Sequence, residues 1–360
     1  METETVSIRL VPEKKGLILK HSEYEITSKK YKTTVVRRYN DFVTFHGLLL
    51  TRFPYRKIIL RMLPRLPPKQ IMLDSLLEER RRGLQRWLQI VCQHPVISAG
   101  PMLEAFMTDK SSEHLEHLRS VFAKELDEFS KLSDNTELPL EDQGRLASNR
   151  EMMRLMLNCL TRFKRLAEQH CARTQSQSMD MNDMSTILKT IDSSKSCFSE
   201  GIFNTMITCL QDIASSSSKS SAMQESVVVE KLNLLMDVLF AHSDLCDRVE
   251  KGIMSDHQRA LSKMISINRQ KIKGVIRGSA AENVAALHKQ EVAQTGVVGS
   301  LGRRSAFSLH CVLQETALAQ QYLQIFPSIL LSLSCVQQKE HNELAKFWEK
   351  IMQRKTTESS

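Results

Sequence analysis

A short stretch near the start of the chain brings together side chains that bind phosphate groups. Arg37, Arg38 and Tyr39 follow a run of β-branched residues in TTVVRRY. One guanidinium can donate two hydrogen bonds to the same phosphate, and each hydrogen bond to a charged group contributes about 1.5–3 kcal/mol. Arginine pairs and tyrosines are common, so the surrounding sequence has to decide whether this stretch is a binding site.

Further cationic positions follow this stretch along the chain. Lys69 comes directly after the prolines of PRLPPK, and Arg80 lies in EERRRGL, four residues before Leu84. A lysine ammonium acts as a point charge, whereas a planar guanidinium also fixes a direction. Arg81 and Arg82 adjoin Arg80 and can replace it in an alignment.

The elements that must position these residues can be predicted from the pattern of apolar side chains. Residues 5–39 alternate as three short antiparallel strands do. A helix with Asn40 as its N-cap and Pro54 as its stop follows, and further helices are expected over 75–94 and 102–107. The helical residues expected to face inward are Phe42, Phe45, Leu48, Leu49 and Phe53, then Leu77, Leu84, Trp87, Leu88 and Val91. Residues 1–110 therefore read as one α+β domain.

The charge of the chain is concentrated in its first third. The net charge is +9, and residues 1–110 contain 20 Lys+Arg against 11 Asp+Glu, whereas residues 111–360 contain 30 of each. Seven of the nine prolines and four of the five tyrosines also precede residue 110. Two different kinds of domain are therefore expected to meet near that position.

Neither a membrane span nor a disulfide framework is expected. The longest uncharged stretch, from Thr316 to Gln338, is interrupted by Pro327 and by serines and glutamines, so it does not supply the ~20 apolar residues that a spanning helix needs. The first residues, METETVSIRL, do not resemble a signal peptide. The eight cysteines include no CxxC pair, so reduced structural thiols in a cytosolic or peripheral protein are predicted.

After Lys110 the pattern changes to long helices. One heptad seam, typical of helices that pack along their length, comprises Leu232, Leu235, Leu239, His242, Cys246, Val249 and Ile253. A second comprises Met152, Met156, Cys159, Phe163, Leu166 and His170. A third segment runs from about Ala306 to Met352, with Pro327 as an expected kink. Three antiparallel helices of roughly 45–60 residues, about 70–90 Å long, are predicted for residues 141–356.

The breaks between these helices are predicted from serine and glycine clusters. DSSKSCFSEG at 192–201 and ASSSSKSS at 214–221 are expected to bracket a short helix between the first and second long helices. KGVIRGSAAE at 273–282 marks the turn between the second and third. GVVGSLG at 296–302 is an expected weak point early in the third.

The order of motifs in residues 5–108 resembles the PX (phox homology) domain. RRY, a capped helix, LPPK and EERRRGL occur in that family's order. The resemblance implies that Arg38 binds the 3-phosphate of phosphatidylinositol 3-phosphate and that Tyr39 packs on the inositol ring. It further implies that Lys69 meets the 1-phosphate and that Arg80 holds the 4- and 5-hydroxyls.

Other residues of this region are given different expectations. Arg37, Arg81 and Arg82 are expected to be solvated or to face the bilayer. KIILRML before PRLPPK is longer and more apolar than the family's usual link, and the span from Lys69 to Arg80 is short. The aliphatic side chains here either dip into the bilayer or form an extra helical turn on the domain. They are Ile58, Ile59, Leu60, Ile71, Met72 and Leu73, with Ile71 and Met72 as membrane-contact candidates.

A PX domain followed by three long helices resembles the sorting nexins that carry a BAR domain. This likeness implies a homodimer on curved membrane, peripheral on the cytosolic face of early endosomes. It also implies a role in sorting from early endosomes to the trans-Golgi network. No acidic residue occurs from 257 to 281, so this helix end is either a membrane contact or a solvated cationic terminus. Its membrane-contact candidates are Lys263, Arg269, Lys271, Lys273 and Arg277.

The segment 111–140 is expected to link the two domains. Residues 113–132 form an amphipathic pattern, with Leu115, Leu118, Phe122, Leu126, Phe129 and Leu132 on one face. A helix here either wedges into the bilayer or packs between the domains. The segment has five acidic and three basic residues, which favours packing because an anionic surface repels acidic side chains.

Catalysis and nucleic-acid binding find little support in the sequence. His114 and His117 lack the glutamate arrangement of a zinc helix, and GVVGSLG lacks the Lys-Ser/Thr of a phosphate loop. Base-stacking aromatics are not interleaved along the basic region. We therefore expect no enzyme activity, no metal, no cofactor and no nucleic-acid partner.

An adaptor is the alternative that stays open. PRLPPK has the usual form of an SH3-domain ligand. In that interpretation the long helices form a dimeric coiled-coil scaffold without specific lipid recognition, and Pro64 and Pro67 face solvent. The identity of any cargo or SH3 partner is not encoded in these patterns.

Overall fold

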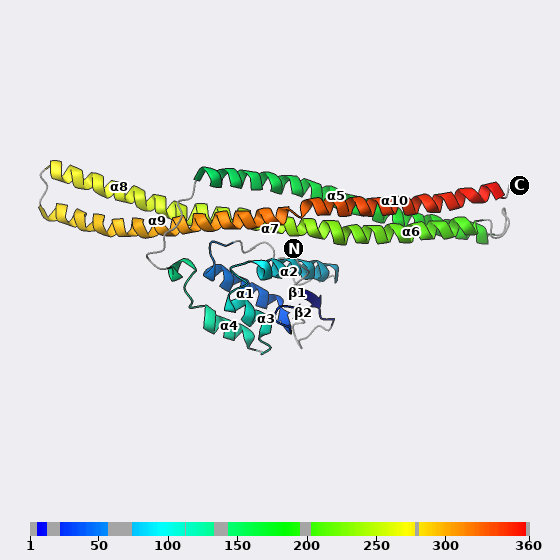
Figure 1. The fold of residues 1–360 in the computed structure, drawn as a ribbon, viewed down its shortest axis with the longest axis horizontal. Coiled ribbons are helices and arrows are strands. Elements are labelled where there is room, and N and C mark those ends of the chain that lie inside the picture. Colours follow the sequence, from blue (N-terminus) through cyan, green and yellow to red (C-terminus); the bar gives the residue numbers. More distant parts are fainter. Residues whose placement is uncertain are drawn as a thin grey trace. The chain divides into compact units, whose positions relative to one another are not determined.

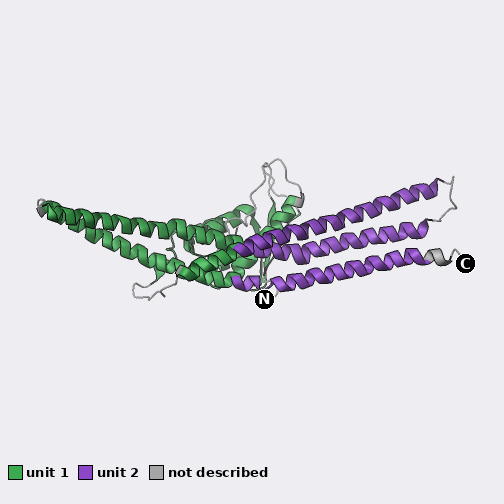
Figure 2. Ribbon diagram, turned by 90° about the horizontal axis from the view of Figure 1, so that it is seen from above, with its two compact units in different colours: residues 1–154, 237–319 green, residues 155–236, 320–360 purple. Residues whose placement is uncertain are grey.

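The computed structural model describes residues 6–12, 22–56, 74–111, 113–132, 143–194, 203–277 and 281–357 (Figure 1). The chain divides into two compact units. Unit 1 comprises Met1–Arg154 and Asp237–Ala319, and unit 2 comprises Leu155–Met236 and Gln320–Ser360 (Figure 2).

The first elements of unit 1 form the predicted antiparallel meander. Strands β1 (Val6–Leu10), β2 (Glu23–Ser28) and β3 (Thr33–Arg38) pair in the order β1-β2-β3. Glu23 pairs with Arg38 and Ser28 with Thr33 across β2 and β3. Alternate side chains of a strand point to opposite faces, so Val35 and Arg37 are buried while Arg38 is exposed.

Helix α1 (Tyr39–Arg52) begins earlier than the sequence predicts. Its N-cap is Arg38, and Asn40 is an exposed residue of the first turn. The expected Asn40 cap is therefore wrong. The physical reason is Asp41, whose carboxylate Oδ2 accepts the backbone N–H of Arg38 at 2.8 Å and so satisfies the start of the helix. The helix ends at Arg52, and its C-cap Phe53 directly precedes Pro54, the predicted stop.

The core of the α+β region is aromatic. Helices α2 (Asp74–Gln93) and α3 (Pro101–Thr108) supply Trp87 and Phe106, which pack on Phe42 and Phe45 of α1. The rings of Phe45 and Phe106 stack with centroids 4.2 Å apart. The inward residues predicted for α2 are all buried, which confirms the predicted face: Leu77, Leu84, Trp87, Leu88 and Val91.

The segment after α3 is not the single amphipathic helix predicted over 113–132. It forms α4 (His114–Phe122) and a short 3-10 turn, η2 (Phe129–Lys131). Leu118 and Phe122 are buried as α4 packs on α1 and α3, whereas Leu126 is 62% exposed. Beyond the helix, Arg52 donates to the carbonyl of Leu126, and Asp127 accepts the N–H of Ser130.

The remaining elements are long helices, as predicted, but the second helical run is longer than the roughly 45–60 residues expected, because the serine cluster does not interrupt it. A continuous helical run from 204 to 276 includes two π-helical turns, η3 (Glu225–Val229) and η4 (Glu250–Met254). Within η4, Gly252 leaves helical geometry with φ −94° and ψ −106°. Pro327 stands near the start of α10, at the predicted kink. The helices are α5 (Gln143–Ser193), α6 (Asn204–Gln224), α7 (Glu230–Val249), α8 (Ser255–Ile276), α9 (Ala281–Leu323) and α10 (Phe326–Thr357).

The serine run 214–221 is not the predicted break, because it lies inside α6. The hydroxyls of Ser216 and Ser220 donate to Glu343 and Glu340 of α10. Ser221 donates to the carbonyl of Cys171 in α5 at 3.0 Å. Small side chains allow helices to approach closely, and these hydrogen bonds satisfy the hydroxyls within unit 2. The glycine segment 296–302 is likewise helical, inside α9.

The two predicted seams had different outcomes. The α7 seam is confirmed, since each of its seven residues is 9% exposed or less. The α5 seam is wrong in register, because the buried positions are Met153, Leu160, Ala167 and Cys171. Cys159 is exposed and Leu166 is 54% exposed. The predicted seam therefore lies beside the face of α5 that is packed. Helix α5 has apolar side chains on two of its sides, and only one of these sides is buried.

The described cysteines are free thiols. Burial raises the pKa of Cys311 to about 12 and that of Cys246 to about 11. A thiol with such a pKa stays protonated at neutral pH and is a poor nucleophile. These two cysteines therefore act as small core residues, as the sequence predicts.

Candidate functional site

The candidate site begins at the junction of β3 and α1. Arg38 is the last residue of β3, and its side chain is 56% exposed. Its Nε lies 3.5 Å from Oε1 of Glu23, the residue opposite it on β2. The backbone of Arg38 is fixed by Asp41, so a guanidinium that reaches solvent is held on a rigid strand end.

Tyr39 and Arg80 meet beside Arg38. The guanidinium carbon of Arg80, on α2, lies 5.1 Å from the ring centroid of Tyr39. Arg80 is only 4% exposed, and its Nε has no hydrogen-bond partner among the described residues. Burial raises the pKa of Tyr39, and the Arg80 charge partly offsets this effect. A buried guanidinium with an open donor is costly, so a ligand that accepts its hydrogen bond gains affinity.

The arginines next to Arg80 are engaged elsewhere. Arg81 donates to Glu78 at 2.7 Å and to the carbonyl of Ile8, and Arg82 donates to the same Glu78. The hydrogen bond from Arg81 lowers the pKa of Glu78, although burial opposes this shift. Of the three consecutive arginines, Arg80 is therefore the one that stacks on Tyr39.

Arg37 is a structural residue, which corrects the expectation that it is solvated or faces the bilayer. It is 2% exposed and donates to the carbonyls of Phe106 and Asp109. Burial lowers its pKa, and the neighbouring Asp41 and Asp109 oppose that shift. The alternation of the strand explains the difference, because Arg37 and Arg38 point to opposite faces of β3.

The structure thus brings Arg38, Tyr39 and Arg80 together. The other predicted residues of this region, Lys69, Ile71 and Met72, lie outside the described residues, as does the segment 57–73. Of the predicted lipid-binding residues, the structure therefore describes Arg38, Tyr39 and Arg80.

A cavity of about 460 Å³ beside Arg38 was not predicted from the sequence. Its lining includes Glu23, Asp41, Lys110 and His114. Both ring nitrogens of His114 face oxygens, the Ser111 carbonyl at 2.9 Å and Asp41 Oδ2 at 3.0 Å. The histidine thereby ties α4 to the carboxylate that caps α1. The sequence gave no signal for this contact, since 73 residues separate His114 from Asp41.

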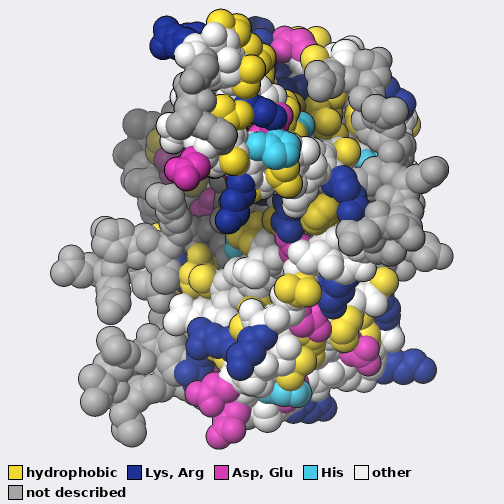
Figure 3. Space-filling view, turned by 90° about the vertical axis from the view of Figure 1, so that its left-hand side faces the viewer, with side chains coloured by type: hydrophobic (Ala, Val, Ile, Leu, Met, Phe, Trp, Pro, Cys, Tyr) yellow, Lys and Arg dark blue, Asp and Glu magenta, His cyan; other side chains and the backbone are white. Residues whose placement is uncertain are grey.

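The basic end of α8 divides into two groups. Lys263, Arg269, Lys273 and Arg277 are exposed. Lys271 instead forms a salt bridge with Glu291 of α9 at 2.5 Å, and this pairing lowers the pKa of Glu291. Figure 3 looks onto this end of α8 and α9, where basic and hydrophobic side chains adjoin on the surface.

A buried polar cluster joins the α+β region to α9 within unit 1. Glu315 is fully buried, with Oε1 2.8 Å from His94 Nε2 and 3.6 Å from Arg56 Nη1. Arg56 also donates to Glu128 and to Gln314, the latter at 2.7 Å. Burial lowers the pKa of Arg56, but the hydrogen bond to Glu128 and the surrounding charges raise it overall.

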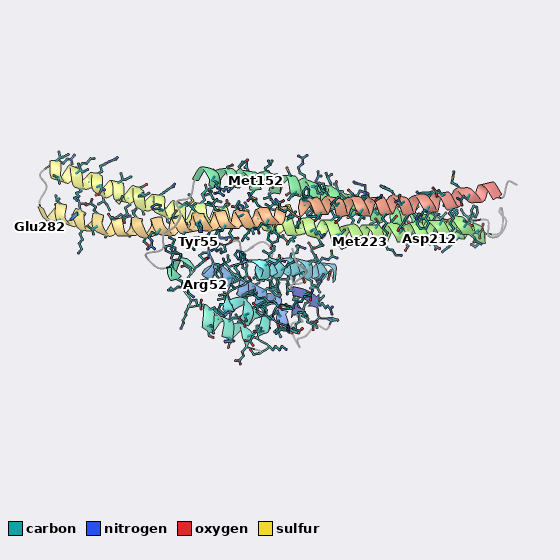
Figure 4. The ribbon with its side chains drawn as sticks, viewed as in Figure 1. Arg52, Tyr55, Met152, Asp212, Met223 and Glu282 are labelled. Carbon is teal, nitrogen blue, oxygen red and sulfur yellow. The ribbon has the colours of Figure 1, made fainter. Side chains whose placement is uncertain are left out.

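The tautomer of His94 follows from its other hydrogen bonds. The backbone N–H groups of Val96 and Ile97 both donate to His94 Nδ1 at 3.2 Å. Nδ1 is therefore an acceptor, so Nε2 carries the proton and donates to Glu315. Tyr55 adds an apolar contact beside this cluster, with its ring 6.0 Å from that of Phe307 (Figure 4).

Comparison with known proteins places the chain in a family. The sequence profile of the PX domain matches residues 25–110. Sorting nexin-8 of Homo sapiens is 34% identical over 364 residues, which cover 96% of this chain and 77% of that protein. The chain belongs to the sorting nexin family. Within it, sorting nexin MVP1 of Mycosarcoma maydis is 26% identical over 80% of this chain and 45% of its own length.

The fold of this sorting nexin also matches a solved structure. The cryo-EM structure of the SNX-BAR Mvp1 tetramer has a TM-score of 0.72 at 19% identity, covering 97% of this chain and 100% of that chain. The PX-BAR architecture predicted from the sequence is confirmed. PX-BAR sorting nexins are non-enzymatic, membrane-associated trafficking proteins. In the described part of the chain, no helix is long and apolar enough to cross a bilayer.

Proposed function

We propose that this sorting nexin recognises phosphatidylinositol 3-phosphate on the cytosolic face of early endosomes. There it acts in sorting cargo towards the trans-Golgi network. The observation that carries the proposal is the stack of Arg80 on Tyr39, with an open, buried donor, next to the solvent-reaching guanidinium of Arg38. Arg38 would bind the 3-phosphate, and the Tyr39 ring would pack on the inositol.

Each remaining residue has a chemical role in this proposal. Arg80 would donate to the 4- and 5-hydroxyls, because a hydroxyl oxygen accepts the hydrogen bond that its Nε lacks. Lys69 would meet the 1-phosphate as a point charge. In this proposal Arg80 donates to hydroxyls at positions 4 and 5, so lipids with further phosphates at these positions are expected to bind more weakly than phosphatidylinositol 3-phosphate.

Sedimentation with vesicles tests the proposed function. We expect the full chain to bind vesicles that contain phosphatidylinositol 3-phosphate with roughly micromolar strength, about 8 kcal/mol. Vesicles with unphosphorylated phosphatidylinositol should bind at least tenfold more weakly, and 4- or 5-phosphorylated lipids are the specificity controls. Equal binding to all of these lipids would remove the proposed recognition. The adaptor alternative then gains support if Pro64→Ala and Pro67→Ala variants lose an SH3-domain partner.

Homodimerisation is part of the proposal, and the second apolar face of α5 supports it. In unit 2 this face includes Leu155, Leu166 and Ile187, which are 56%, 54% and 58% exposed. It lies away from the packed positions Leu160 and Ala167. Large apolar side chains on an exposed helix face mark an interaction surface. Two weak headgroup sites linked in one dimer would bind a vesicle far more tightly than either site alone.

A Leu166→Asp variant is expected to shift the protein from dimer to monomer. Burial of a leucine contributes about 1.5–3 kcal/mol, so the dimer dissociation constant should rise at least tenfold. Sedimentation velocity over a range of protein concentrations measures this change. Asn182→Asp is the matched control, because it adds the same charge at an exposed position on the side of α5 opposite Leu166, about 160° around the helix. A variant as dimeric as the wild type would place the interface elsewhere.

A further inference from the structure

The ring of His114 lies between two oxygen atoms that can only accept hydrogen bonds. Its Nδ1 is 2.9 Å from the carbonyl oxygen of Ser111, and its Nε2 is 3.0 Å from Oδ2 of Asp41. A neutral imidazole carries one N–H group, whereas the imidazolium ion carries two. Both contacts are therefore hydrogen bonds only when His114 is protonated.

Asp41 connects this histidine to the candidate headgroup site. The Asp41 side chain is 5% exposed, and the Oδ2 atom that contacts His114 also accepts the backbone N–H of Arg38 at 2.8 Å. That hydrogen bond fixes the start of α1, whose first residue is Tyr39. One carboxylate therefore separates His114 from the residues that are proposed to bind the 3-phosphate and the inositol ring.

The charged groups around His114 come from several elements of unit 1. Helix α4 packs on α1 and α3 (Figure 1). Glu113 and Glu116 lie beside His114 at the start of α4, where the helix N-terminus carries a partial positive charge. The other charged groups line the same cavity of about 460 Å³ as His114: Glu23 on β2, Arg37 and Arg38 on β3, Asp41 on α1 and Lys110 after α3. The carboxylates attract an imidazolium ion and the cations repel it, so an anion that binds among these groups favours the protonated ring.

We propose that His114 is a positioning residue for headgroup recognition and that its protonation strengthens the binding of the phosphorylated headgroup. The proposal rests on the proposed function, because it concerns the same site. The protonated ring neutralises the Asp41 carboxylate and holds α4 to the start of α1. In the neutral form one of the two hydrogen bonds is lost, and the charge of Asp41 stays uncompensated near the phosphate. Because a histidine takes up a proton as the pH falls, binding should become tighter at lower pH.

The first test measures vesicle binding of the full chain at about pH 8 and about pH 6. The phosphate of the lipid also titrates in this range, so the wild type is compared with a His114→Gln variant on the same vesicles of phosphatidylcholine and phosphatidylinositol 3-phosphate. We expect equal binding at the higher pH and about three- to tenfold tighter binding by the wild type at the lower pH. His114→Phe is a second neutral variant with the same expected profile. Circular dichroism at both pH values establishes that each variant is folded.

The matched control is His117→Gln, one turn further along α4. The side chain of His117 is 60% exposed, pairs with Asp109 at 2.9 Å and does not line the cavity. Its hydrogen bond is the main cause that lowers the pKa of Asp109 to about 2, so this histidine also interacts with a carboxylate. The His117→Gln variant should nevertheless keep the pH profile of the wild type, because the group that it removes lies outside the candidate site.

The second test detects the proton directly. Calorimetry with a soluble short-chain phosphatidylinositol 3-phosphate, in two buffers of different ionisation enthalpy, gives the protons that are taken up on binding. Near neutral pH the wild type should take up more protons than His114→Gln, and His117→Gln should match the wild type. A hydrogen bond with a structural role alone would not change this quantity.

The two proposals fail in distinguishable ways. Equal pH profiles of the wild type and His114→Gln, or equal proton uptake, overturn the role of His114 and leave the proposed function standing. A His114→Gln variant that is weaker by the same factor at both pH values would show a structural role only, and it also overturns the proposal. Wild-type protein that does not distinguish phosphatidylinositol 3-phosphate from phosphatidylinositol at either pH would refute the proposed function, and the role of His114 with it.

Discussion

An Arg38→Ala variant is expected to bind vesicles that contain phosphatidylinositol 3-phosphate roughly 10- to 100-fold more weakly than the wild type. The variant loses up to two charge-assisted hydrogen bonds of about 1.5–3 kcal/mol each. It also leaves the Glu23 carboxylate, which is 7% exposed, near the expected phosphate without the Arg38 cation. Repulsion between these two anions adds to the loss.

Three further variants sharpen this prediction. Arg38→Lys keeps the charge without the planar fork and should bind with intermediate strength. Arg38→Ala/Glu23→Gln removes the repelling carboxylate and should recover part of the affinity lost by the single variant. Arg154→Ala is the control, because Arg154 is 70% exposed on α5 and pairs only with the nearby Glu151 among the described residues. Unchanged vesicle binding by Arg38→Ala would show that another residue holds the 3-phosphate.

An Arg56→Met variant is expected to lose about 3–5 kcal/mol of unfolding free energy. The side chain of Arg56 is 6% exposed and that of Glu315 is fully buried, so removal of the guanidinium takes a positive charge away from a carboxylate in the interior. Breaking a buried pair by removing one partner costs this amount because the remaining charge is desolvated. Urea unfolding of the full chain, followed by circular dichroism, measures the change.

The double variant Arg56→Met/Glu315→Leu separates charge from packing. Two apolar residues of similar volume can replace a buried ion pair at little cost, so we expect this variant to be more stable than Arg56→Met alone. Arg259→Met on α8 is the control, because its pairing with Asp256 is largely exposed and contributes little. A single variant that loses less than about 1 kcal/mol would mean that water or a shifted side chain compensates Glu315.

Local pattern predicted most of the elements because their causes are local. The alternation in β1, β2 and β3 follows from one sheet face being buried, and the α7 seam is a single stripe that packs on one side. The α5 register failed for the opposite reason. Met153 and Leu160 of α5 are buried in the protein, whereas Leu166 is exposed. When a helix has two apolar faces, its sequence alone does not tell which of them packs within the same chain.

The sequence predicted the candidate-site residues that belong to a short motif, but not those whose role depends on contacts with distant parts of the chain. Arg38 and Tyr39 follow directly from the strand end, but the choice among Arg80, Arg81 and Arg82 depends on which of them Glu78 and the Ile8 carbonyl engage. The structural role of Arg37 could not be predicted for the same reason, because its hydrogen-bond partners lie about 70 residues away at the end of α3. The Arg56 cluster joins residues more than 250 positions apart, such as Arg56 and Gln314 at 258, and no local pattern encodes such a contact.

The irregular turn at Gly252 has a mechanical consequence. A regular α-helix resists bending along its whole length, since every turn is closed by hydrogen bonds. At Gly252 the backbone leaves helical geometry. No described neighbouring atom lies within 4 Å of the position that a Cβ would occupy at this residue, so side-chain packing does not hold the turn in place there. We therefore expect a force applied to the far end of α8 to be taken up at this one joint, so that the tip can tilt while the helix on each side stays stiff.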